Sequence, residues 1–228
     1  MSDRLQSQRE SSRIRLIVID DHPLFRRGLV SMINNEPDMV VCAQAEKHHQ
    51  ALDLIASKNP DIATVDISLG ESDGLSLIKD IRERFSSLPV LVISMHDESL
   101  YAERAIRAGA RGYISKQQMD ETVLLALRQV LRGEDYISAE ISSFLSQKYL
   151  HGHSRSRNHS VAGLSDRQLE VFRLIGESMC TRQIAERMHL SVKTIESHRE
   201  HIKSKLTLHS GAELARAASI WVATGRMR

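Results

Sequence analysis

Short apolar runs alternate with amphipathic segments through the first half of the chain. The runs are rich in Val and Ile and are bounded by polar residues, which is typical of buried strands. The segments between them are about ten residues long and carry apolar side chains at helical spacing. This alternation predicts right-handed strand–helix–strand units and a doubly wound, five-stranded parallel sheet with helices on both faces. The predicted strands are residues 14–19, 39–43, 61–66, 88–94 and 111–115.

The pattern changes toward the middle of the chain. A helix over residues 119–131, with Gly133 as its C-cap, closes the α/β region. Residues 139–149 are weakly helical, and residues 151–160 are polar and rich in Ser, which is typical of a linker. From Gly163 onward the pattern is helical. We therefore predict a disordered N-terminal extension, an α/β domain, a partly helical linker and an all-α domain, at residues 1–12, 13–132, 133–162 and 163–228.

Four helices are expected in the all-α domain. Ser165 and Gln168 form a capping box that opens the first. A short helix over residues 181–188 and a longer one over residues 192–206 follow, joined by a tight turn, and this arrangement is a helix-turn-helix. A second capping box, Ser210-Gly-Ala-Glu213, opens the last helix.

Composition narrows the class of protein. The chain has 228 residues, 41% hydrophobic and 26% charged, with a formal net charge of +2, so it is not a polyelectrolyte overall. Its two cysteines, Cys42 and Cys180, form no Cys-x-x-Cys pair, which argues against a zinc ribbon or redox motif. The polar N-terminus lacks the apolar core of a signal peptide, and no apolar run reaches transmembrane length. We expect a soluble cytoplasmic protein with no membrane partner.

Acidic side chains follow the strands of the predicted sheet. Asp20 and Asp21 end the first strand, Asp66 ends the third, Ser94 ends the fourth, and Lys116 follows the fifth. The carboxyl ends of parallel strands meet at one edge, so these groups converge. Clustered carboxylates and hard oxygen ligands suit Mg²⁺. A carboxylate can also attack phosphorus to form an acyl phosphate, whose charge an amine and a hydroxyl would stabilise.

The motifs around these residues resemble a known family. Val18–Pro23, Asp66, Ser94 and Gly109–Lys116 resemble the receiver domain of bacterial response regulators, which has a flavodoxin-like fold. The resemblance covers residues 13–132. It implies a chain that is not an enzyme in its own right but takes a phosphoryl group on Asp66 from a sensor histidine kinase, with Lys116 and Ser94 assisting.

The same resemblance implies a magnesium site and a switch. The implied Mg²⁺ ligands are the carboxylates of Asp20, Asp21 and Asp66 and the main-chain carbonyl of Ser68. Ser94 would move toward the phosphoryl group, and Tyr113 would rotate inward behind it. One position departs from the family pattern, because Gly70 stands where the family usually has a proline in the loop after the phospho-acceptor.

The predicted helix over residues 192–206 has an apolar stripe and an opposite polar face that would enter a major groove. Residues 163–225 resemble the LuxR-type DNA-binding domain, so the whole chain resembles the NarL/FixJ response regulators. The family's glycine before the second helix is Ser178 here, and its usual serine cap is Cys180, so we expect Thr181 to cap that helix. The resemblance implies DNA contacts from Lys193, Thr194, Glu196, Ser197, Glu200 and Lys203.

The last helix is implied to pair across a dimer on near-palindromic DNA, through Leu214, Ala218 and Trp221. Homodimerisation would follow phosphorylation, and RNA polymerase is a further candidate partner. The residues also allow other hypotheses. The receiver could be vestigial in a constitutive regulator, although the intact acidic set argues against this. The helical domain by itself could be a small interaction bundle. A hydrolase with Asp66 as nucleophile lacks the second acid of the Asp-x-Asp-x-Thr pattern, since Ser68 stands there.

Overall fold

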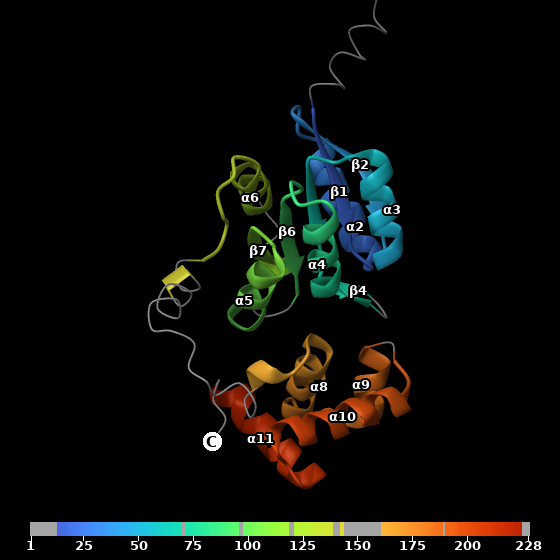
Figure 1. The fold of residues 1–228 in the computed structure, drawn as a ribbon, viewed down its shortest axis with the longest axis vertical. Coiled ribbons are helices and arrows are strands. Elements are labelled where there is room, and N and C mark those ends of the chain that lie inside the picture. The colour runs from blue at the N-terminus through green and yellow to red at the C-terminus, as the bar shows by residue number, and fades with distance from the viewer. Residues whose placement is uncertain are drawn as a thin grey trace, which may run out of the picture. The chain divides into compact units, whose positions relative to one another are not determined.

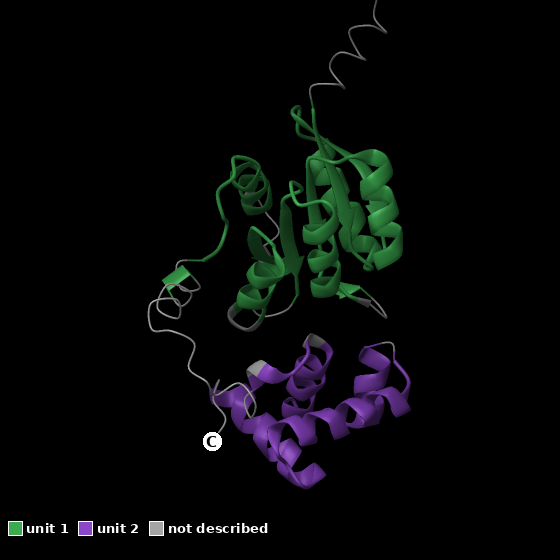
Figure 2. Ribbon diagram, in the orientation of Figure 1, with its two compact units in different colours: residues 1–147 green, residues 148–228 purple. Residues whose placement is uncertain are grey.

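The chain forms two compact units, Met1–Gln147 and Lys148–Arg228 (Figure 2). Its structure is a computed structural model that describes residues 13–69, 72–95, 98–118, 121–138, 142–143, 161–188 and 190–224. The predicted disordered extension at residues 1–12 and the Ser-rich part of the predicted linker lie outside the described residues. Within the described ranges, no helix combines the length and the hydropathy that crossing a membrane requires.

The N-terminal unit is built on a five-stranded parallel sheet in the order β2-β1-β3-β6-β7 (Figure 1). The predicted fold class of this half is therefore confirmed. All five predicted strands are present, and their side chains are largely buried because both faces of the sheet are covered. The strands are β1 Ile14–Ile19, β2 Met39–Ala45, β3 Ile62–Val65, β6 Val90–Ser94 and β7 Gly112–Ser115.

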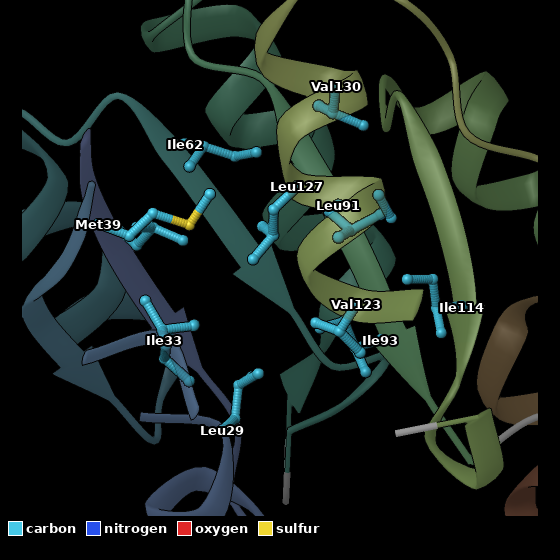
Figure 3. Packing of buried hydrophobic residues seen from close by; sticks show 13 residues of the cluster. Leu29, Ile33, Met39, Ile62, Leu91, Ile93, Ile114, Val123, Leu127 and Val130 are labelled. Carbon is cyan, nitrogen blue, oxygen red and sulfur yellow. The ribbon is translucent and has the colours of Figure 1, made fainter. Parts of the chain in front are cut away.

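Among the described residues, five α-helices accompany this sheet. Helices α2 and α6 share one face, where their apolar side chains pack on the strands around Leu91 and Ile93 (Figure 3). Helix α4 packs against both α3 and α5. The helices are α2 Pro23–Asn34, α3 His48–Lys58, α4 Gly74–Arg84, α5 Glu98–Ala108 and α6 Glu121–Leu131, the last of which is followed by Gly133 at φ +84° as predicted.

A small antiparallel hairpin, β4 Ser68–Leu69 and β5 Ser72–Asp73, follows the third strand and was not predicted. Asp73 then caps α4 by accepting a hydrogen bond from the Leu75 amide at 3.0 Å. Gly74 is required here, because a Cβ atom would lie 2.1 Å from the carbonyl oxygen of Asp66. The departure at Gly70 lies outside the described residues.

The C-terminal unit is helical, and the predicted all-α class is confirmed. Ser165 and Gln168 form the predicted capping box at the start of the first helix. At the last helix the amide of Glu213 donates to Ser210 as predicted, whereas the Glu213 carboxylate accepts from the amide of His209 and not from Ser210. The helices are α8 Asp166–Gly176, α9 Thr181–Arg187, α10 Val192–Leu206 and α11 Gly211–Thr224, with a short 3-10 turn, η2 Val161–Gly163, before them.

The junction before α9 differs from the expectation. Cys180 is the N-cap residue, and its amide donates to the Gln183 side chain at 2.9 Å, so the prediction that Thr181 caps this helix is wrong. Ser178, which stands at the family's glycine position, has a φ of 65°. The left-handed backbone explains why glycine suits this position.

Helix α11 packs on α8 and completes the core of the C-terminal unit. Gly176 lets the two helices approach closely, since a Cβ atom there would lie 2.5 Å from the carbonyl oxygen of Ala218. The rings of Phe172 and Trp221 have centroids 5.5 Å apart. Leu214 and Ala218 are 0% exposed and Trp221 is 7% exposed, so the structure uses these side chains inside the unit. A dimer contact by α11 remains a prediction, and it would need the exposed positions of this helix.

Candidate functional site

The acidic edge of the sheet brings together groups from four strand ends. Asp20 follows β1, Asp66 follows β3, Ser94 ends β6, and Lys116 follows β7. Their relative exposures are 2%, 2%, 0% and 7%, so all four side chains are nearly removed from solvent. Because the strands are parallel, their carboxyl ends all lie at one edge of the sheet, and residues far apart in sequence meet there.

Lys116 joins two buried carboxylates. Its Nζ lies 2.7 Å from Asp66 Oδ2 and 2.7 Å from Asp20 Oδ2. The same ammonium group lies 4.2 Å from the centroid of the Phe25 ring, a cation–π contact that fixes it from the side of α2. Buried carboxylates repel each other strongly unless a cation separates them. Lys116 therefore supplies the charge that allows the two carboxylates to share this pocket.

His22 also belongs to this site, although the sequence pattern did not predict it. Its Nδ1 lies 2.7 Å from Asp21 Oδ1, 3.5 Å from Asp20 Oδ1 and 3.7 Å from Asp66 Oδ2. Its amide donates to Asp20 Oδ1 at 2.8 Å, which fixes the turn after β1. The position of His22 directly after the paired acids was the available signal, but a sequence does not show which way an imidazole turns.

The two buried carboxylates differ in acidity. Burial, followed by the charge of Asp66, raises the pKa of Asp20 above its usual value. Burial by itself would also raise the pKa of Asp66, but the neighbouring His22 and Lys116 outweigh it, and the pKa of Asp66 lies below its usual value. Ser94 donates a hydrogen bond to Asp66 and acts in the same direction. Asp66 is thus held as an ionised carboxylate at neutral pH, the form that can act as a nucleophile.

The acidic edge has the donor set of a cation site. One ligand atom from each of Asp20, Asp21, His22 and Asp66 lies within 4.8 Å of the others. Carboxylate oxygens are the ligands that hard divalent cations prefer. The predicted additional ligand, the carbonyl of Ser68, belongs to the half-buried β4, and the amide of Ser68 donates to Asp66 Oδ1 at 3.2 Å. The carboxylates present therefore fit a divalent cation such as Mg²⁺.

Tyr113, the predicted switch residue, lies in the middle of β7 and is 2% exposed. Its side chain is therefore buried in this structure. Its strand neighbour is Val92 of β6, two residues before Ser94. The main-chain amide of Tyr113 donates to the carbonyl of Tyr136 at 2.9 Å, on the side of β7 away from β6.

Helix α10 presents the predicted DNA-contacting residues. Lys193, Glu196, Ser197 and Glu200 are exposed, whereas Thr194 and Lys203 are half-buried. The hydroxyl groups of Thr194 and Ser191 lie 2.7 Å apart at the N-cap. The buried stripe of Ile195, Ile202 and Leu206 fixes which face of the helix points outward.

Charges on the exposed face are partly paired within the helix. Lys203 Nζ lies 2.9 Å from Glu200 Oε1, so the carboxylate does not present a lone negative charge. Lys205, in contrast to Lys203, forms hydrogen bonds to another part of the C-terminal unit. Its Nζ donates to the carbonyl of Gly163 at 3.1 Å and to Gln168 Oε1 at 2.9 Å, which ties α10 to the start of α8.

Comparison with known proteins assigns each of the two units to a protein family. Residues 16–128 match the response regulator receiver domain family, and residues 162–218 match the bacterial regulatory proteins of the luxR family. The oxygen regulatory protein NreC of Staphylococcus haemolyticus is 36% identical over 210 residues, which cover 90% of this chain and 96% of that protein.

Solved structures with a similar fold include two response regulators. A two-component response regulator of the LuxR family from Aurantimonas shares 29% identity at a TM-score of 0.56, covering 61% of this chain and 99% of that one. RcsB of Salmonella enterica serovar Typhimurium, bound to the promoter rprA in the presence of phosphomimetic BeF3-, shares 23% identity at a TM-score of 0.57, covering 91% and 98%. The second likeness bears on the fold alone.

A receiver joined to a LuxR-type helix-turn-helix is the class that the fold and the matched families define. The chain belongs to the NarL/FixJ, or LuxR-type, family of two-component response regulators, which are DNA-binding transcription regulators.

Proposed function

We propose that a sensor histidine kinase phosphorylates this response regulator on Asp66, and that phosphorylation controls binding of α10 to promoter DNA. The observation that carries the proposal is the buried arrangement in which Lys116 lies 2.7 Å from both Asp20 and Asp66. It keeps Asp66 ionised inside the unit and places a cation where extra negative charge would develop.

In the proposed transfer, an ionised oxygen of Asp66 attacks the phosphorus of the kinase's phosphohistidine. A bond from the Asp66 oxygen to phosphorus forms, the phosphorus–nitrogen bond breaks, and the leaving imidazole takes up a proton. Lys116 stabilises the charge of the product, and Ser94 donates a hydrogen bond to it. Mg²⁺ held by Asp20, Asp21, Asp66 and the Ser68 carbonyl would supply further positive charge beside the transferred group.

Water attack on the acyl phosphate returns Asp66 to its carboxylate and releases inorganic phosphate. We propose this autodephosphorylation as the only turnover of the chain. The switch would pass from Ser94 to the buried Tyr113, which would rotate inward behind it. We further propose that the protein acts in the cytoplasm, as a homodimer on near-palindromic sites, with RNA polymerase as a further partner.

The phosphorylation step is tested by intact mass after incubation with Mg²⁺ and a small phosphodonor. The wild type and the control Asp53→Asn, an exposed change on α3, should gain the mass of one phosphoryl group, and Asp66→Asn should gain none. Equal uptake by Asp66→Asn, or no uptake by the wild type, would contradict the assignment of Asp66.

The DNA interface is tested by the salt dependence of binding to a target fragment. Lys193→Ala should weaken binding on all sequences and reduce the slope of log K against log salt by about 1, because one phosphate contact is lost. Lys79→Ala on α4 serves as the control, since it removes one positive charge from the other unit. An unchanged slope for Lys193→Ala would remove that residue from the interface.

A further inference from the structure

The segment after α6 returns along the free edge of the sheet. The chain turns at Gly133, with φ +84°, and Tyr136 forms a parallel bridge with Gly112 of β7. The amide of Tyr113 donates to the carbonyl of Tyr136 at 2.9 Å, and the amide of Tyr136 donates to the carbonyl of Arg111 at 2.8 Å. We call residues 133–138 the edge strap. They continue the order of the sheet beyond β7, although the sequence pattern predicted them as linker.

Side chains from three elements hold the edge strap. Arg111, which precedes β7, donates from Nη2 to the carbonyl of Gly133 at 2.6 Å, and its Nε lies 3.0 Å from Asp135 Oδ1. Gln129 of α6 donates to the carbonyl of Asp135 at 2.8 Å. At the other end, the amide of Ser138 donates to Glu98 Oε1 of α5 at 3.1 Å. The strap is therefore a specifically held segment.

The fit between the edge strap and β7 is close. A Cβ atom on Gly112 would lie 2.9 Å from the carbonyl oxygen of Tyr136 and 2.7 Å from a methyl group of Leu91. The Tyr136 side chain is half-buried and packs against the main hydrophobic cluster of the unit. The absence of a side chain at Gly112 thus allows the strap to lie directly against the strand.

The same strand connects the edge strap to the acidic edge. Tyr113, whose amide bonds to the strap, lies three residues before Lys116, and Ser115 of β7 pairs with Ser94 of β6. A movement of Tyr113 or of the end of β7 therefore acts directly on the strap's hydrogen bonds. The ion pair between Arg111 and Asp135 is exposed and contributes little to stability, so the strap depends mainly on its few hydrogen bonds and on the packing of Tyr136.

We propose that the edge strap is a phosphorylation-sensitive latch, docked on β7 while Asp66 is unmodified and released when Asp66 carries a phosphoryl group. This inference rests on the proposed function of Asp66. Release would make six more residues part of the connection between the two units, and six extended residues span about 20 Å. That length is a substantial part of the roughly 34 Å between the half-sites that a dimeric helix-turn-helix protein contacts.

Hydrogen exchange of the full-length protein tests the latch. The amides of Tyr113 and Tyr136 should be protected in the unmodified protein and should exchange at least about tenfold faster after Mg²⁺ and a small phosphodonor are added. Phosphoryl uptake is measured by intact mass on the same sample. Uptake without any change in exchange would overturn the latch and leave the proposed function intact, whereas absence of uptake would overturn the proposed function and the latch with it.

A variant provides the second test. Arg111→Ala removes both side-chain bonds at the start of the strap, so unphosphorylated Arg111→Ala should show faster exchange at Tyr136 and about fivefold tighter DNA binding than the wild type. Gln129→Ala should do the same to a smaller extent if Arg111→Ala folds poorly. Arg84→Ala on α4 is the control and should match the wild type. Faster exchange at Tyr136 with unchanged DNA affinity in both strap variants would overturn the regulatory role.

Discussion

A small set of residues decides the electrostatics of the acidic edge. Asp20 and Asp66 are both buried, and Lys116 contacts both, yet their pKa values are shifted in opposite directions. The difference arises because Asp66 has additional stabilising neighbours in His22 and Ser94, whereas burial and the charge of Asp66 dominate at Asp20. When two titrating groups share one cation, their environments determine which of them stays ionised.

Ser178 offers a test at the residue scale. Its φ of 65° costs a non-glycine residue about 1–2 kcal/mol, and glycine would lose about 0.5–1 kcal/mol through its extra freedom in the unfolded chain. Ser178→Gly should therefore stabilise the C-terminal unit by about 0.5–1 kcal/mol. Ser204→Gly, within α10, should destabilise it by a similar amount. Denaturant unfolding, followed by the fluorescence of the single tryptophan, Trp221, measures the change in the free energy of unfolding for each variant. If both variants stabilise the unit, or both destabilise it, the prediction is wrong.

Helices in this protein are positioned by how closely their backbones approach and by what they bury. Helix α11 lies close to α8 because Gly176 has no side chain. Helix α10 is oriented by its buried stripe and tied to the start of α8 by Lys205. These contacts hold α10 on a fixed base, so its exposed face can be presented as a rigid surface.

Gly176→Ala should destabilise the C-terminal unit. A Cβ atom would lie 2.5 Å from both the Ala218 carbonyl oxygen and a methyl group of Val222, and such overpacking costs about 1–3 kcal/mol. Gly28→Ala on α2 is the matched control, because a Cβ atom there meets nothing within 4 Å. This change should stabilise the N-terminal unit by about 0.5–1 kcal/mol through helix propensity. Circular dichroism during denaturant unfolding measures both, and stabilisation by Gly176→Ala would argue against the close helix contact.

The stability of the C-terminal unit should depend on His198 of α10. Burial, then the charges of Arg167 and His201, lower the pKa of His198 below 6.5. The folded state then binds fewer protons than the unfolded state, so this contribution is complete above about pH 6.5 and is lost as the pH falls below that value. When the pH is lowered from about 8 to about 5.5, the denaturant concentration at the unfolding midpoint, reported by Trp221 fluorescence, should decrease. The decrease should be smaller in His198→Gln. The same pH dependence in both proteins would remove His198 as the cause.

At the level of the whole molecule, the chain consists of two units, each with its own hydrophobic core. The acidic edge lies in one and the exposed face of α10 in the other. Control of one by the other therefore has to pass along the chain that joins them or through contacts that change with phosphorylation. The edge strap lies at the beginning of that connection.

Mg²⁺ should stabilise the two units differently. A ligand that binds only the folded state at about 100 times its Kd stabilises it by about 2.7 kcal/mol. In unphosphorylated protein, Mg²⁺ should raise the unfolding transition of the N-terminal unit, followed by circular dichroism, and leave the Trp221 transition unchanged. Asp21→Asn should weaken the first effect. A Mg²⁺-dependent shift of the Trp221 transition would instead show that the units are energetically coupled before phosphorylation.

Much of this protein follows from local sequence pattern. The order of strands and helices, the bounds of α10 at Val192–Leu206 and the residues at the strand ends could be predicted, because periodicity and capping are properties of neighbouring residues. The family motifs then predicted the receiver and the LuxR-type domain. Parallel topology explains why the strand-end residues, Asp20 and Asp66 among them, meet at one edge.

Only the tertiary structure decided the features that depend on distant neighbours. His22 joined the acidic edge because its ring turns toward three carboxylates. Leu214 lies in the core because α11 packs on α8, whereas an apolar stripe by itself could also face a second chain. Residues 133–138 looked like a linker because their attachment depends on Arg111, Gly112 and Glu98, which belong to other elements. Hydrophobic periodicity records that a side chain is buried, but the fold determines which partner buries it.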